Sequence, residues 1–171
     1  MFEKIRKMKN QKGFTLVELI VVLVILAILA AMLVPALTGY IDKANNQKIV
    51  ATTRQVVMAA QTEISEAYGK GKLENDSVTI EQGQDKKDPA NDKNITGDAI
   101  AKLAEVGEFK TDKYELKNGI TKIVVTYSPE GHVTKLELTQ GKKVCTYTEG
   151  ATGGNNGAYD VQPVPSTTVG G

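Results

Sequence analysis

Hydrophobic residues are concentrated in one run near the start of the chain. Phe14 opens this run, and from Leu19 to Ile41 no residue is charged, a span of 23. A helix of that length rises about 34 Å at about 1.5 Å per residue, which is enough to cross the hydrocarbon core of a bilayer. The pattern therefore predicts that residues 14–41 form a helix that enters a membrane.

The next stretch of the chain, residues 42–68, has its apolar residues on one side of the predicted helix. Between Asp42 and Tyr68 the apolar residues recur at helical spacing, and the charged residues lie mostly off their stripe. Gly69 is a typical residue for the end of a helix. We expect one helix of about 80 Å from Phe14 to Tyr68, apolar on all sides in residues 14–41 and amphipathic in residues 42–68. The stripe consists of Ile49, Val56, Val57, Ala60, Ile64 and Ala67.

A second, much shorter helix is expected after a polar, turn-rich stretch. Either Thr96 or Asp98 can cap it, because both side chains accept hydrogen bonds from the first free N–H groups of a helix. The pattern runs to about Glu105, and Gly107 is the expected end. Two residues are expected to face inward, Ile100 and Leu103.

The remaining β-rich stretches predict a small antiparallel sheet. Ser128–Gly131 reads as a tight turn with proline at its second position. Tyr114–Leu116 is a candidate fourth strand, and Ser77–Glu81 alternates as a short edge strand does. The three expected strands of the meander are Ile120–Tyr127, Val133–Thr139 and Lys142–Thr148. We predict an α+β fold in which a sheet of three to four strands packs on the C-terminal half of the long helix, with residues 69–148 as the globular head.

The last part of the chain differs in composition. Gly150–Gly171 holds six glycines, two prolines and one charged residue. Such a segment cannot bury enough apolar area to fold alone. We expect residues 149–171 to be a low-complexity tail that either lies along the sheet or extends freely, with Tyr159, Val161 and Val164 as its packing anchors.

The charge of the chain is unevenly distributed. Residues 1–13 hold five basic side chains against Glu3, a net charge of +4, whereas the remainder has a net charge of −3. Basic segments beside a membrane span stay in the cytoplasm, so we expect the N-terminus inside and the head outside. The exported part has no large basic field, so dedicated nucleic-acid binding is not expected.

Few residues are suited to catalysis, disulfide formation or metal binding. Cys145 is the only cysteine and cannot form an intrachain disulfide. It lies in the predicted strand Lys142–Thr148, so we expect it to be a small core residue and not a reactive thiol. His132, the only histidine, follows a turn and is expected at the surface rather than in a catalytic triad. Asp85, Asp88 and Asp92 lack the ligand spacing and central glycine of a calcium loop. We therefore expect no catalytic residue, no metal site and no cofactor.

Three interpretations of the N-terminus are open from the residues alone. The run could be a secretory signal that is cleaved at a small-x-small site near residues 29–31 or 34–36. It could be an uncleaved anchor, or the chain could be cleaved before the run, between Gly13 and Phe14. The sequence of residues 12–18 helps to distinguish these three interpretations.

The sequence Lys-Gly-Phe-Thr-Leu-Val-Glu at residues 12–18 resembles the class III leader of type IV pilins and pseudopilins. The resemblance covers roughly the first 45 residues. It implies that a prepilin peptidase cuts after Gly13 and N-methylates Phe14. The size, the single cysteine and the polar tail most resemble a major pilin of a Gram-positive, clostridial anaerobe.

Glu18 is a charged residue close to the start of the apolar run. A carboxylate inside a transmembrane helix costs about 2.5–3.5 kcal/mol on insertion scales, so a partner is expected. No Lys or Arg lies within helical reach on its apolar side. After cleavage, the α-amine of Phe14 in a neighbouring subunit can pair with Glu18 and set the axial register of two helices. The alternative is a glutamate that lies at the membrane surface and stays hydrated.

Pro35 lies inside the helical run. It removes one backbone hydrogen bond and clashes with the preceding turn, so a kink is expected there, softened further by Gly39. The resemblance implies that such helices partly unwind in a filament between a glycine and this proline. Ala27 stands where the family often has that glycine, which argues against unwinding here. A transmembrane kink without a mechanical role is the alternative.

The resemblance implies a structural subunit of type IV pili that polymerises with itself. The implied partners are the prepilin peptidase, an assembly ATPase with its platform proteins, minor pilins and, before assembly, the membrane. The prepilin would be a single-pass membrane protein, and the filament would serve adhesion, aggregation, biofilm formation and twitching motility. One alternative is a major pseudopilin of a type II secretion or DNA-uptake system. An alternative of another class is a membrane-anchored monomeric binding protein.

Overall fold

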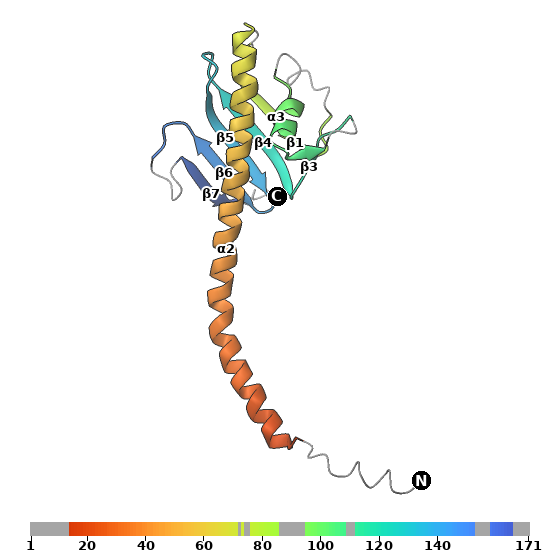
Figure 1. Cartoon of the computed structure of the whole chain (residues 1–171), viewed down its shortest axis with the longest axis vertical. Coiled ribbons are helices and arrows are strands. Elements are labelled where there is room, and N and C mark those ends of the chain that lie inside the picture. Colours follow the sequence, from red (N-terminus) through yellow and green to blue (C-terminus); the bar gives the residue numbers. More distant parts are fainter. Residues whose placement is uncertain are drawn as a thin grey trace, which may run out of the picture. The chain divides into compact units, whose positions relative to one another are not determined.

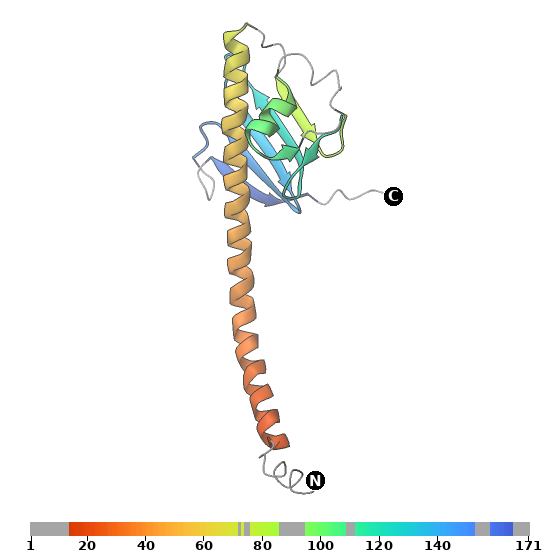
Figure 2. The same cartoon turned by 45° about the vertical axis from the view of Figure 1, so that its right-hand side comes forward.

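The computed structural model describes residues 14–71, 73, 76–85, 95–108, 112–152 and 158–165. The chain divides into two compact units, residues 1–44 and residues 45–171, which we call the N-terminal unit and the C-terminal unit. Figures 1 and 2 show the long helix α2, which contributes to both units, and a sheet and a short helix α3 in the C-terminal unit. The architecture is the predicted α+β fold.

Helix α2 spans Leu16–Gly69, which confirms the predicted helix to within two residues at its start and one at its end. Every described residue of the N-terminal unit is exposed. In the C-terminal unit the buried residues of α2 recur at helical spacing, as the amphipathic pattern predicts. They are Ile49, Val50, Thr53, Val56, Ala59, Ala60, Ile64 and Ala67. Val57, placed on the stripe by its spacing, is only partly buried.

The main sheet has five strands, more than the expected three to four. Its order is β1-β4-β5-β6-β7, and all neighbours are antiparallel. The three central strands are those of the predicted meander, and β1 is the predicted edge strand. The additional strand comes from the tail, because a meander leaves unpaired N–H and C=O groups along both edges. The strands are β1 (Ser77–Glu81), β4 (Ile120–Tyr127), β5 (Val133–Gln140), β6 (Lys143–Thr148) and β7 (Tyr159–Pro163).

The tail therefore lies along the sheet, which is one of the two alternatives left open by its composition. Strand β7 pairs with β6 in register, with Cys145 opposite Val161. The ring of Tyr159 lies 5.1 Å from that of Tyr147, and the guanidinium of Arg54 on α2 lies 5.0 Å from the Tyr159 ring centre. Aromatic and cation–π contacts of this kind fix a strand that has few apolar residues. Val164, also expected as an anchor, remains exposed.

A separate two-stranded sheet contains the segment that we expected to be the fourth strand of the meander. Strand β3 (Glu115–Leu116) pairs with β2 (Gly107–Glu108) and not with β4. Asn118 and Gly119 both adopt positive φ angles, 57° and 75°, between β3 and β4. This left-handed pair redirects the chain, so β3 cannot continue into the main sheet.

Helix α3 spans Gly97–Leu103, and Thr96 is its N-cap, accepting a hydrogen bond from the N–H of Ala99. The prediction that Gly107 ends the helix is wrong. Glu105 takes the left-handed position, with φ 56°, and its N–H donates to Lys102 O while that of Val106 donates to Ala101 O. These two bonds form a Schellman motif, in which glycine is the usual left-handed residue.

The core joins α2 to one face of the main sheet. Ile64 and Ala60 of α2 belong to one buried cluster with Ile123, Leu136 and Leu138. Leu136 and Leu138 lie two residues apart on β5, and both are fully buried.

Gln61 ties α2 to the β4–β5 turn. Its Nε2 donates to Gly131 O at 2.7 Å, and its Oε1 accepts from Val133 N–H at 2.9 Å. Gly131 has a φ of 85°, and a Cβ there would lie 3.0 Å from the Tyr68 side chain, so glycine suits this close approach.

Candidate functional site

The start of α2 is organised by a reciprocal pair of hydrogen bonds between Thr15 and Glu18. Thr15 precedes the first helical residue, and its carbonyl accepts the N–H of Leu19 at 3.3 Å. The Thr15 hydroxyl oxygen accepts the Glu18 N–H at 3.3 Å. In return the Thr15 N–H and hydroxyl donate to Glu18 Oε2 at 2.9 and 2.8 Å. The arrangement is a capping box, which satisfies two of the free N–H groups at a helix start.

The sequence indicated Glu18 as a residue of this site, but Thr15 was not predicted. The spacing Thr-x-x-Glu before an apolar run is a sequence signal for a capping box, so the pattern was available in the sequence. The capping bonds from Thr15 end on Oε2, and Oε1 accepts no hydrogen bond from the residues that the structure describes. An ionised carboxylate offers about four lone-pair sites, so the cap leaves capacity for a further donor.

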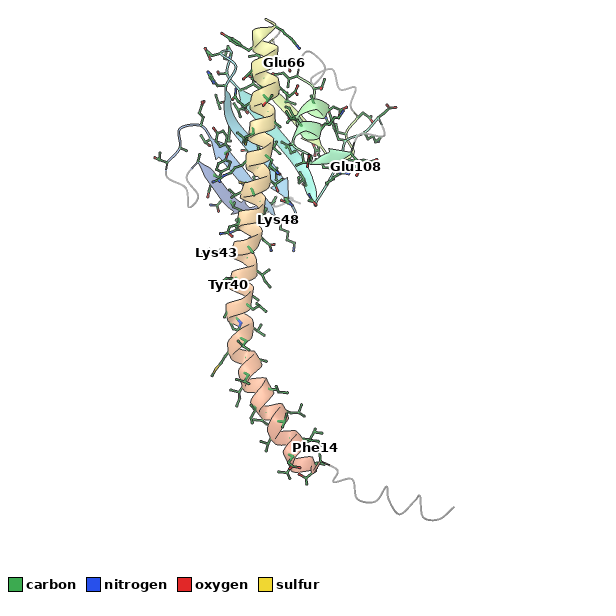
Figure 3. All side chains as sticks on the ribbon, viewed as in Figure 1. Phe14, Tyr40, Lys43, Lys48, Glu66 and Glu108 are labelled. Carbon is green, nitrogen blue, oxygen red and sulfur yellow. The ribbon has the colours of Figure 1, made fainter. Side chains whose placement is uncertain are left out.

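Phe14 lies at the tip of the described helix and is 86 % exposed (Figure 3). Gly13, the other residue of the predicted cleavage site, lies outside the described residues. The backbone N–H of Phe14 becomes an ammonium group if the chain is cut before it. That ammonium would be four residues from Glu18 on the same helix start.

Most side chains of residues 16–41 are apolar and exposed, and Figure 3 shows side chains projecting from both edges of this part of the ribbon. They include Leu19, Val24, Leu26, Leu29 and Leu33, each about half exposed or more. Among the described residues α2 is long and apolar enough to cross a membrane, and its apolar window has no buried residue. Such a surface needs a cover of lipid or of other helices, because this chain provides none for the described residues.

Pro35 lies within α2, and the hydroxyl of Thr38 donates to the Pro35 carbonyl at 2.8 Å. Figure 1 shows the ribbon of the N-terminal unit gently curved. A Cβ added at Gly39 would meet no atom within 4 Å. The predicted kink at Pro35 and Gly39 remains a prediction.

The described residues of the C-terminal unit include few side chains arranged for metal binding or catalysis. They contain no group of three or more His, Cys, Asp or Glu that could hold a metal ion. Asp85 pairs with Lys113 at 3.7 Å, while Asp88 and Asp92 lie outside the described residues. His132 is exposed, as expected of a surface histidine.

Cys145 is fully buried and has no disulfide partner. Burial raises the pKa of its thiol above the ordinary value of 9.0, although a hydrogen bond with Thr53 opposes this rise. A thiol with a raised pKa holds little thiolate at neutral pH and is a poor nucleophile. Cys145 is the small core residue that its strand position predicts.

Residues 8–34 match a family model described as the prokaryotic N-terminal methylation motif. The match runs across the Gly13–Phe14 junction and Glu18 into the apolar run. It confirms the predicted class III leader and supports a type IV pilin-like prepilin. No curated protein and no solved structure was found to match the chain. The motif points to a structural protein, and together with the apolar helix it fits a membrane-anchored prepilin.

Proposed function

We propose that this chain is the major subunit of a type IV pilus, cut between Gly13 and Phe14 and methylated on Phe14. The single observation that carries the proposal is the methylation motif at residues 8–34, which continues into a helix that the described residues of the chain leave uncovered. In this proposal the chain consists first of a leader (residues 1–13), an assembly helix (residues 14–41) and its amphipathic continuation (residues 42–68). Residues 69–148 form the head, and residues 149–171 form the C-terminal tail.

In this proposal the apolar helix has two successive covers. Lipid covers it while the prepilin spans the membrane with its N-terminus in the cytoplasm, and neighbouring helices cover it in the filament. Extraction from the bilayer loses the lipid contacts, and burial of the same surface against other copies offsets that loss. The polymer is then the stable state in water. An assembly ATPase with its platform, the prepilin peptidase and minor pilins are the partners that this cycle requires.

Glu18 has two functions in the proposal. Its Oε2 caps the helix through Thr15, and its Oε1 accepts the methylated amine of Phe14 from a neighbouring copy. The pair would form where water is scarce, so its attraction is weakly screened. A copy that docks one turn out of register leaves both charges unpaired, which is costly in that setting. The charge pair therefore fixes the axial register of the filament.

Three variants separate the charge of Glu18 from its capping function. Glu18→Gln keeps a capping side chain but removes the charge, because Glu and Gln both serve at this position of a capping box. Glu18→Ala removes both functions, and Thr15→Ala removes the cap while leaving the carboxylate. The readout is the amount of the chain in filaments sheared from cells and pelleted, relative to the amount in membranes.

We expect Glu18→Gln and Glu18→Ala to lose nearly all filaments while the processed chain accumulates in the membrane. Thr15→Ala costs about 1 kcal/mol of helix stability and is expected to retain filaments. Wild-type filament yield from Glu18→Gln would refute the charge pair. Loss of filaments from Thr15→Ala alone would assign the effect of Glu18 to its cap.

A pseudopilus subunit of a secretion or DNA-uptake system shares the leader and Glu18. The described residues hold no cluster suited to a metal ion, and the tail is long and polar, which favours the pilus. Adhesion, biofilm formation and twitching motility are functions that a pilus of this kind would serve. Filaments that pellet from sheared wild-type cells distinguish the pilus from a short, cell-bound pseudopilus and from an anchored monomer.

A further inference from the structure

A groove of about 450 Å³ lies between helices α2 and α3 in the C-terminal unit. Met58 of α2 and Leu103 at the end of α3 both line it, and they are 70 % and 51 % exposed. Leu103 was expected to face inward, and that prediction is wrong. Helix α3 ends at Leu103, about two residues before its predicted end, and Leu103 lies at the rim of the groove. Two large apolar side chains around one hollow mark a surface that gains from being covered.

The groove has one charged residue, Glu105, and no basic residue among those that line it. Glu105 is exposed and sits at the left-handed position just beyond α3. The other lining residues are apolar or, in Gln55 and Thr62, polar and uncharged, so Glu105 alone gives the groove its acidic edge. A partner that fits it presents a small polar or apolar protrusion with positive charge beside it.

A surface of the opposite charge lies nearer the N-terminus of α2, where the helix meets the β5–β6 turn. It surrounds a pocket of about 290 Å³ lined by Lys48, Lys142 and Lys143, and no acidic residue lines it. Lys143 donates to Asn46 Oδ1 at 2.6 Å, while Lys48 and Lys142 are exposed. Gly141 and Lys142 form the two-residue turn between β5 and β6, with Gly141 at a positive φ of 58°. We call Lys48, Gly141 and Lys142 the basic corner.

The two surfaces are offset along the same helix. Met58 is ten residues beyond Lys48, which is about 15 Å along the axis of an α-helix. Copies that pack with parallel helices and an axial shift of this size bring the groove of one copy to the same height along the helix axis as the basic corner of the next. The two faces differ, so the contact does not close on itself and repeats along a filament.

We propose that the groove around Met58 and Leu103 receives the basic corner of a second copy of this chain. The contact rests on the proposed function, since it needs a polymer in which the helices run parallel. Glu105 then faces Lys48 and Lys142, and the turn at Gly141 enters the groove against Met58. The head thereby adds a second specific contact to the proposed pairing of Glu18 with Phe14 between the apolar helices.

Oxidation of methionine tests the contact in the full chain. Hydrogen peroxide converts exposed methionine to its sulfoxide, and peptide mass spectrometry measures the rate at each position. The comparison is between sheared filaments and the same chain dispersed in detergent. We expect Met58 to oxidise at least about tenfold more slowly in filaments. Met32, which lies in the apolar helix, reports independently that the filaments are intact.

The outcomes separate this contact from the proposed function. Filaments in which Met32 is protected but Met58 oxidises as fast as in detergent would overturn the contact and leave the pilus proposal intact. Failure of the wild-type chain to form filaments would overturn both.

A charge exchange provides a second test that is specific for the partner surface. Glu105→Lys and Lys142→Glu should each lower the pelleted filament about three- to fivefold, as expected for a surface pair turned repulsive. The double variant should recover most of the loss. Glu149→Lys is the matched control, because Glu149 is exposed and does not line the groove. Equal loss from the control, or no recovery in the double variant, would contradict the proposed pairing.

Discussion

The two halves of helix α2 have the same backbone geometry and opposite relations to water. In residues 14–44 every side chain is exposed, although most are aliphatic. In residues 45–69 one stripe is buried against the sheet, and the charged residues Lys48, Arg54 and Glu66 lie outside it. The comparison shows that helix formation alone does not decide where apolar surface is buried. The second half is covered by its own chain, and the first half has to be covered by something else.

The polar groups of the two halves differ in the same way. Glu66 in the second half pairs with Lys70 at the surface, where the pair contributes little. Glu18 in the first half lies among apolar residues, and the described contact of its carboxylate is the cap with Thr15. A carboxylate in such a place is costly unless a further donor is supplied, and the proposed supplier is another copy of the chain.

The largest effect should come from the buried stripe. Ile64→Ala deletes three carbon atoms from a fully buried site and should lower the free energy of unfolding of the C-terminal unit by about 2–5 kcal/mol. Membrane retention should be unchanged. Denaturant titration of the full chain in detergent, followed by the near-ultraviolet circular dichroism of the tyrosines, measures the loss. Met58→Ala, at an exposed position of the same helix, should change it by less than about 0.5 kcal/mol.

A charge in the apolar half should have the converse effect. Leu26→Lys should add about 2.5–3.5 kcal/mol to the cost of membrane insertion and should abolish filaments. The stability of the C-terminal unit should not change. Fractionation of cells into membranes, filaments and medium provides the measurement, with Leu26→Met as the matched control. A Leu26→Lys chain that assembles normally would show that the apolar half is not the covered surface.

A smaller effect is expected at the end of α3. Glu105 is a non-glycine residue in the left-handed region, which costs about 1–2 kcal/mol relative to glycine. Glu105→Gly should therefore raise the free energy of unfolding of the C-terminal unit by about 1 kcal/mol. Glu105→Ala, which also loses the charge but retains the Cβ, should give no such gain. Equal changes in the two variants would place the cause in the charge.

The smallest effect should be a loss of stability at alkaline pH. Burial raises the pKa of the Cys145 thiol from 9.0 and that of Tyr127 from 10.0, the latter also through Asp76. Above about pH 9 the unfolded chain loses these protons while the folded chain keeps them, so the free energy of unfolding falls as the pH rises. Cys145→Ala should reduce the slope between pH 8.5 and 10. An unchanged slope would exclude the thiol as its source.

Local signals predicted most of the fold. The apolar run, the amphipathic stripe and Gly69 define α2, while β-branched residues and the Ser128–Gly131 turn define the central strands. What could not be predicted depends on contacts between distant residues. Strand β7 has few apolar side chains and is fixed by pairing with β6 and by Arg54 on α2. The end of α3 was mispredicted for a local reason, because its left-handed residue is Glu105 and not the glycine that usually marks such an end.

The candidate site shows the same division. The apolar run and Glu18 were apparent from hydrophobicity and charge, because a carboxylate in such a run is conspicuous. The cap formed by Thr15 was missed, although its spacing is a known local signal. The groove between α2 and α3 has no sequence signal, since it depends on where two helices meet and on where one of them ends.

The intact mass of the chain in sheared filaments tests the central claim most directly. Pelleted filaments and membranes from the same cells are each analysed by mass spectrometry of the whole protein. The account predicts a pelleted species that begins at Phe14 and carries one additional methyl group. A chain that begins at Met1 and is found only in membranes would contradict both cleavage and polymerisation.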